Sequence, residues 1–159
     1  MIATPADIHI RTFDDADTEP VIALWREAFP EYNASDKPHR EPRRSIANKI
    51  AMRDGLFFVA VREREIAGTV MAGYDGHRGW VYSLAVSRAL RRRGVASALL
   101  RHAEIALTER GCLKLNLQVL THSREALAFY AAHGYAADDV VSLGKRLPLV
   151  STANGQTMP

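Results

Sequence analysis

The chain has 159 residues, 47% hydrophobic and 25% charged, with a formal net charge of +3 that permits an anionic partner without requiring nucleic acid. Its length fits one domain, and a single cysteine excludes a disulfide framework and a thiolate zinc cluster, so we expect a reducing, cytoplasmic compartment. No apolar run approaches the roughly 20 residues of a membrane span, and we expect neither a secretory signal nor a membrane partner.

In the first half of the chain, the hydrophobic period changes from helical to alternating. A short alternating stretch over 8–12 predicts a strand, and apolar residues three and four apart predict a helix that ends at Pro30. A polar, proline-rich loop and a short basic helix over 43–52 follow. Stretches rich in β-branched and aromatic residues, separated by short turns, predict an antiparallel meander with strands at 56–61, 66–74 and 80–86.

The second half continues with alternating helices and strands. An apolar stripe between 95 and 107 predicts a helix, and later patterns predict a strand over 114–119, a helix over 123–133 and a final strand over 140–147. Residues 148–159 lack periodicity, and we expect a disordered tail. With no linker or internal repeat, the elements predict one α/β domain over 1–147.

The stretch LRRRGVASALL, at 90–100, places three arginines and Gly94 where a helix begins. Cations are normally favoured at the opposite end, because the macrodipole makes a helix N-terminus positive. Small residues at Gly94 and Ala96 let a ligand approach the backbone, whose first N–H groups lack intrahelical partners. Two interpretations stay open: a phosphate-binding turn, or a solvated arginine cluster beside a simple glycine turn. The glycine motifs of Rossmann dinucleotide sites and P-loops are absent from the sequence.

Residues Arg91–Ala96, with their flanking strand and helix, resemble the Q/R-x-x-G-x-G/A signature of the GCN5-related N-acetyltransferases, and the resemblance extends over about 8–147. The stretches GYDGHRG (73–79) and SLGKRL (142–147) resemble a small bacterial YpeA-type subgroup. The resemblance implies a mixed, mostly antiparallel sheet of about six to seven strands flanked by about four helices. It also implies acetyl-CoA as cosubstrate, an amine-bearing acceptor and no metal.

By this resemblance, the N–H groups of 92–97 hold the pyrophosphate of acetyl-CoA, and the strand edge at 84–86 pairs with its pantetheine arm. The implied coenzyme-binding residues are Leu84, Ala85, Val86, Arg91, Arg92, Arg93, Gly94, Val95, Ala96, Ser97 and Ser123.

Residues 123–135 are similar to the family's N-x-x-A-x-x-φ-Y-x-x-x-G-F/Y segment, φ being apolar, which implies that Tyr130 is the general acid. A phenol, with an ordinary pKa of about 10, can donate a proton or a hydrogen bond to the departing CoA sulfur. By residue type alone, a core aromatic beside Phe129 is the competing interpretation. Ser123 replaces the usual Asn, and Gln118 stands where relatives that acetylate protein N-termini commonly carry a glutamate base. An amide cannot accept the proton of the amine.

Asp75 and His77 are the best substitute bases by residue chemistry, since histidine titrates near neutrality. Asp75-Gly76 is also what a tight hairpin requires, so both interpretations stay open. We expect the acceptor between the first two helices and the splayed strands, near Trp25, Phe29 and Tyr32, although such aromatics are more often core. The substrate-binding candidates are Tyr32, Asp75, His77 and Gln118.

Two other classes of function compete with an enzyme. Gln118 favours a sensor that binds acyl-CoA without turnover. A nucleic-acid binder using arginines at 40–44 and 91–93 is disfavoured, because the sequence lacks an RNA-recognition or helix-turn-helix pattern and the net charge is low. The sequence leaves the acceptor open, and fits a monomer or a homodimer.

Overall fold

One mixed sheet dominates the first of the two units into which the chain divides after Gln118. The computed structural model describes residues 5–30 and 38–148. The strands are β1 (His9–Thr12), β2 (Phe57–Arg62), β3 (Glu65–Tyr74), β4 (Gly79–Val86) and β5 (Leu115–Leu117). The helices are α1 (Thr18–Ala28), α2 (Pro42–Ala51) and α3 (Val95–Thr108), with single 3-10 turns η1 (Asp15–Asp17), η3 (Pro38–Arg40) and η4 (Arg88–Leu90). The second unit contains α4 (Arg124–Ala132).

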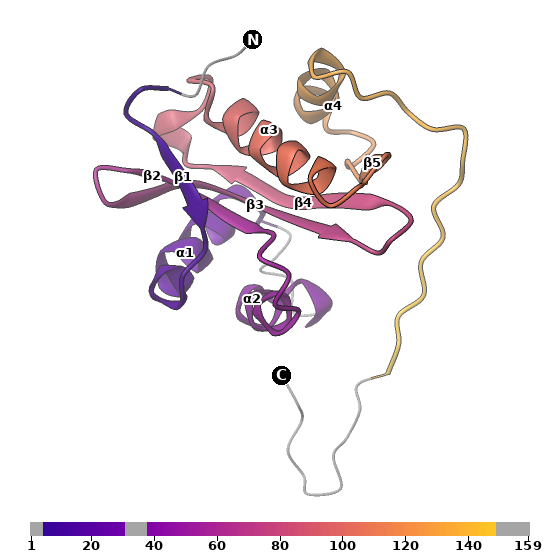
Figure 1. Ribbon diagram of the computed structural model, residues 1–159, viewed down its shortest axis with the longest axis horizontal. Helices are drawn as coiled ribbons and strands as arrows, with labels where there is room; N and C mark the ends of the chain where they lie inside the picture. Colours follow the sequence, from indigo (N-terminus) through magenta and orange to yellow (C-terminus); the bar gives the residue numbers. More distant parts are fainter. Residues whose placement is uncertain (1–4, 31–37, 149–159) are drawn as a thin grey trace, which may run out of the picture. The chain divides into compact units, whose positions relative to one another are not determined.

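The sheet has the order β1-β2-β3-β4-β5, antiparallel from β1 to β4 and parallel between β4 and β5. Helix α3 covers one face, and α1 and α2 lie on the other (Figure 1). The α/β class and the antiparallel meander are therefore confirmed. The single domain over 1–147 stays a prediction, and residues 149–159 of the expected tail lie outside the described residues.

The sheet has five strands among the described residues, rather than the expected six to seven. The strand expected over 140–147 is absent from the described chain, which has no regular structure there. Its apolar side chains are largely exposed: Val140 74%, Val141 83%, Leu143 91% and Leu147 79%. A strand needs a neighbour for its backbone and a buried face for its apolar residues, and alternation alone supplies neither.

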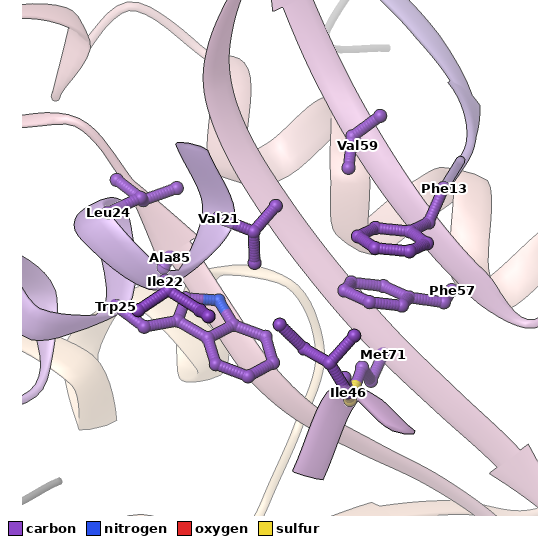
Figure 2. Packing of buried hydrophobic residues seen from close by; sticks show 10 residues of the cluster. All are labelled: Phe13, Val21, Ile22, Leu24, Trp25, Ile46, Phe57, Val59, Met71 and Ala85. Atoms are coloured by element: carbon purple, nitrogen blue, oxygen red, sulfur yellow. The ribbon is translucent and has the colours of Figure 1, made fainter. Parts of the chain in front are cut away.

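Three aromatic residues and several aliphatic ones form the core on the α1 side of the sheet (Figure 2). Phe13 and Phe57 stack with ring centroids 4.4 Å apart, and Trp25 tilts against Phe57 at 6.0 Å. Trp25 is fully buried, as its helical spacing from Val21 predicts. It is therefore a core residue and offers an acceptor no surface, while Phe29 is partly buried against the same cluster.

On the opposite face, α3 packs the stripe that the sequence predicts, with Val95, Leu99, Leu100, Ala103 and Leu107 buried. At Gly68, β3 lies very close to both β4 and α3. A Cβ there would lie 2.7 Å from the Ala85 carbonyl oxygen and 2.9 Å from Leu99 Cδ1. Among the described residues, no helix is both long and apolar enough to cross a membrane.

Replacing Gly68 with alanine should destabilise the fold by about 1–3 kcal/mol, because the backbone oxygen of Ala85 cannot move aside without disturbing the ladder. Gly73→Ala is the matched control on the same strand, where an added Cβ meets nothing within 4 Å. Urea denaturation measures both variants. Equal midpoints would contradict the close packing of β3, β4 and α3.

Candidate functional site

The turn that leads into α3 has two residues with left-handed backbone, Arg92 at φ 60° and Gly94 at φ 83°. Glycine adopts this conformation without the steric cost that a Cβ imposes, which explains Gly94 at the N-cap. The N–H of Ala98 donates to the Gly94 carbonyl at 3.0 Å and closes the first turn of the helix. The N–H groups that precede it lie at the positive end of the macrodipole, where an anion is favoured.

The charge around this turn is positive. Arg91, Arg92 and Arg93 are exposed, and the first turn of α3 contains no acidic residue. Arg91 Nε donates to the Val86 carbonyl at 3.4 Å, a long bond that links the turn to the end of β4. The arrangement suits a polyanion that runs from the end of β4 toward the helix N-terminus.

Strand β4 has unequal neighbours. It pairs with β3 from Gly79 to Val86, but it pairs with β5 only at Gly79, Trp80 and Val81. The edge of Leu84, Ala85 and Val86 that faces away from β3 is therefore outside the sheet ladder. Backbone groups at such an edge can pair with an extended, amide-bearing ligand.

A β-bulge lies where the two neighbours diverge. Thr69 pairs with Ala85 and Met71 with Tyr82, so β4 uses one residue more than β3 over the same length. Ser83 has the strained backbone conformation at this bulge, with a left-handed φ of 52°. The bulge places Tyr82 and Ala85 on the same face of the sheet, since Tyr82 lies beside Lys49 of α2 and Ala85 packs in the α1-side core.

Asp75 organises the hairpin between β3 and β4. Its Oδ1 accepts the N–H groups of Arg78 at 2.6 Å and His77 at 2.7 Å, and these bonds lower the pKa of its carboxyl. A carboxylate with a lowered pKa is a poor general base near neutrality. His77 lies six residues before Ser83, which is at most about 20 Å at the usual rise of a strand. This geometry favours the hairpin interpretation of Asp75.

The remaining acceptor candidates fall in different places. Tyr32 lies outside the described residues. Gln118 is exposed and follows β5 by one residue. Ser123, in the second unit, is the N-cap of α4 and forms no side-chain capping bond.

Tyr130 lies on α4 in the second unit and is partly buried. Its ring makes edge contacts with Phe129 at 5.1 Å and Tyr135 at 5.6 Å, and its carbonyl accepts the N–H groups of His133 and Tyr135. Burial raises the pKa of Tyr130 to about 12. The phenol is therefore protonated throughout the neutral range and is available as a donor.

Sequence reasoning missed a buried cation on α2. The Lys49 side chain is only 4% exposed, and its Nζ donates to Asp54 Oδ2 at 2.6 Å and to the Ala72 carbonyl. It also lies 5.9 Å from the centre of the Tyr82 ring, and burial, with the Asp54 charge, raises the pKa of Tyr82. The sequence signal for this burial was the position of Lys49, three residues after Ile46 and thus on the same face of the helix. Lys49 and Asp54 border a cavity of about 280 Å³ that Phe13 and Phe57 also line.

Among residues 5–30 and 38–148, no group of three or more His, Cys, Asp or Glu side chains is placed to hold a metal ion.

Comparison with known proteins places this geometry in context. The model of the acetyltransferase (GNAT) family matches residues 19–135. Among solved structures, Ard1 from Thermoplasma volcanium is similar with a TM-score of 0.72 and 24% identity, over 82% of this chain and 84% of that one. PaiA N-acetyltransferase from Thermoplasma acidophilum, solved in complex with coenzyme A, has a TM-score of 0.69 and 17% sequence identity. The match covers 84% of this chain and 92% of that one.

The aminoglycoside 6'-N-acetyltransferase AAC(6')-IG from Acinetobacter haemolyticus gives a TM-score of 0.68 and 18% identity over 88% of this chain and 99% of that one. These likenesses confirm the fold. The resemblance to the YpeA-type subgroup stays a prediction.

The raised pKa of Tyr130 predicts that its phenol does not titrate below about pH 11, which is above the ordinary tyrosine value of about 10. NMR of the protein labelled at tyrosine Cζ, followed to pH 10.5, measures this, and Tyr130→Phe assigns the resonance. A Tyr130 resonance that shifts with a midpoint at or below 10 would contradict the burial of the hydroxyl group.

Proposed function

The chain belongs to the acetyltransferase (GNAT) family, whose model matches residues 19–135, and we propose that it is an acetyl-CoA-dependent N-acetyltransferase that acts on a primary amine by direct attack. In this reaction, a C–N bond to the acetyl carbonyl forms and the C–S bond of the thioester breaks. The amine loses a proton, and the CoA sulfur leaves as a thiolate that gains one. Acetyl-CoA supplies the activated acetyl group.

The observation that carries the proposal is the continuity of the β4 edge and the Gly94 turn. Leu84, Ala85 and Val86 have one backbone edge outside the ladder, and the chain then passes through η4 into a left-handed turn at a helix N-terminus. CoA has the complementary order, an arm with two amides followed by a pyrophosphate. Residues 91–97 surround the phosphate end with N–H donors and arginine charge.

Ser123 is the remaining proposed coenzyme contact. A serine is shorter than the family's asparagine, and its side chain makes no capping bond to α4. Its hydroxyl is thus not committed to the helix that it starts.

We expect Tyr130 to stabilise the leaving sulfur. With a pKa of about 12, its phenol is a weaker acid than an ordinary thiol at about 8.5, so complete proton transfer to the thiolate is uphill. A hydrogen bond from the phenol to the developing thiolate is favourable throughout the neutral range. We therefore propose that Tyr130 acts as a hydrogen-bond donor rather than as the general acid that the family segment implies.

The proton of the acceptor needs another route. Gln118 cannot accept it, and Asp75 is engaged by two backbone N–H groups of its own turn. We therefore assign no side chain as the base. The amine can bind in its neutral form, or it can lose its proton to water. Either route accounts for the proton without a side-chain base.

The acceptor site is proposed on the α1 and α2 face of β4. Tyr82 is half-exposed there, next to the Lys49–Asp54 pair. His77 and Tyr32, which lies outside the described residues, remain proposed contacts of the acceptor.

A non-catalytic acyl-CoA sensor is the second candidate, and Gln118 is the observation that favours it. A panel of primary amines with a thiol-release assay separates the two candidates, since a sensor binds the coenzyme and releases no CoA.

Gly94→Glu should weaken acetyl-CoA binding by at least about 100-fold, which corresponds to about 2.7 kcal/mol. The substitution forces a Cβ into left-handed backbone and adds a negative charge at the phosphate site. Calorimetric titration of wild type and variant measures the affinities. Gly94→Ala is the matched control, since it introduces the strain without the charge and should retain part of the binding.

Desulfo-CoA and adenosine 3′,5′-bisphosphate define what the turn recognises, because both keep phosphate groups and lack the thioester. Both should bind to the wild type and lose affinity in Gly94→Glu. Unchanged affinity of the variant for acetyl-CoA would overturn the placement of the coenzyme.

Tyr130→Phe should lower kcat by about 10²–10³-fold, the usual contribution of one positioned hydrogen-bond donor to developing negative charge. Coenzyme affinity should change little, because the phenyl ring keeps its contacts with Phe129 and Tyr135. Steady-state kinetics and calorimetry on the same preparation measure the two effects. Equal kcat values for variant and wild type would remove Tyr130 from the mechanism.

A further inference from the structure

We propose that Trp25 and Thr69 are positioning residues for acetyl transfer, because together they hold the β4 bulge in its strained conformation. The inference rests on the proposed function, since it assigns the bulge a role in placing the thioester. The backbone of Thr69 pairs with Ala85 on the β3 side, opposite the edge proposed for the coenzyme. The side-chain groups of Thr69 and Trp25 therefore act through Ser83.

The physical link is a buried chain of two hydrogen bonds across three elements. The indole Nε1 of Trp25, on α1, donates to Thr69 Oγ1 on β3 at 2.8 Å. The hydroxyl of Thr69 donates in turn to the Ser83 carbonyl on β4 at 2.9 Å. Trp25 and Thr69 are fully buried and Ser83 nearly so, which keeps water from competing for these groups.

Ser83 needs this support. Its left-handed φ of 52° is unfavourable for a residue with a Cβ, and it lies where the register between β3 and β4 shifts. A buried carbonyl that leaves the regular ladder must find another donor. Thr69 supplies that donor, and Trp25 fixes the direction in which the Thr69 hydroxyl points.

Apolar side chains of similar shape would fill both positions. A valine at 69 has the volume of threonine and suits a buried strand better, and a phenylalanine at 25 would keep much of the ring contact with Phe57. The two polar groups therefore serve the connection from α1 to the bulge rather than the filling of the core.

The bulge lies between the two parts of the proposed site. Before it, Tyr82 faces the acceptor side near Lys49, and after it Leu84–Val86 present the edge that the coenzyme arm would use. In a strand without the bulge, Tyr82 and Ala85 would lie on opposite faces of the sheet, because side chains alternate with a period of two. Gly94 and the phosphate turn lie eleven residues beyond Ser83, within their own loop and helix. Loss of the connection should thus disturb thioester placement more than coenzyme affinity.

The test compares Thr69→Val with two matched variants. Thr69→Ser keeps the hydroxyl, and Val70→Thr makes the reverse exchange at the next residue, which is also fully buried but points to the other face of β3. For Thr69→Val we expect kcat to fall at least about 10-fold, as misplacement of reacting groups produces. Its Kd for acetyl-CoA should stay within about threefold of wild type, and Thr69→Ser should recover most of the rate. Trp25→Phe should reproduce the Thr69→Val pattern more weakly.

Amide hydrogen exchange supplies a readout that does not depend on turnover. In Thr69→Val, the amides of 83–86 should exchange faster relative to those of β2, whereas Val70→Thr should change the sheet uniformly through global stability. Unchanged relative exchange at 83–86 overturns the connection. Faster exchange with unchanged kcat overturns the positioning role, as does a joint loss of kcat and affinity that Val70→Thr reproduces. Absence of turnover in the wild type overturns the proposed function instead, and the exchange result still decides whether the bulge depends on Thr69.

Discussion

The structure depends on the unequal pairing of β4. This strand pairs with β3 along its length except at the bulge, but it pairs with β5 only as far as Val81. The second half of β4 therefore has one edge that faces β3 and one edge outside the ladder. An unpaired edge inside a fold is unfavourable unless something pairs with it. The bulge at Ser83 and the turn at Gly94 lie on either side of this edge. Under the proposed function, the coenzyme is the partner that pairs with the open backbone between them.

The arginine cluster follows from the same arrangement. Three cations beside a helix N-terminus repel the partial positive charge of that terminus, and no acidic residue of the first turn compensates them. Such an arrangement lowers the stability of the free protein slightly and strengthens the binding of a polyanion. The Arg91 bond to the Val86 carbonyl connects the turn to the end of β4. Under the proposed function, this bond links the segment that binds phosphate to the strand edge that pairs with the coenzyme arm.

The parts of the site predicted from the sequence are those encoded locally. The meander and α3 follow from periods of 2 and 3.6, and Gly94 marks a turn that only a residue without Cβ adopts freely. The bulge was not predictable, because Trp25 and Thr69 are 44 residues apart and Thr69 and Ser83 are 14 apart. Lys49 was missed because residue type favours exposure, and its burial depends on Asp54 and the Ala72 carbonyl. The strand expected over 140–147 failed for the complementary reason, since alternation specifies a face but not a neighbour.

The side chains proposed for the reaction include a protonated donor but no strong base. Burial keeps the Tyr130 phenol protonated to about pH 12, while the hydrogen bonds that build the hairpin hold the Asp75 carboxylate ionised and weakly basic. Gln118 carries an amide, which cannot accept the proton of the amine. In the proposed reaction, Tyr130 is the hydrogen-bond donor for the leaving sulfur, and neither Asp75 nor Gln118 is a strong acceptor for the proton of the amine. Under the proposed function, the pH dependence of transfer belongs to the amine itself, because only the neutral amine has the lone pair that attacks the carbonyl.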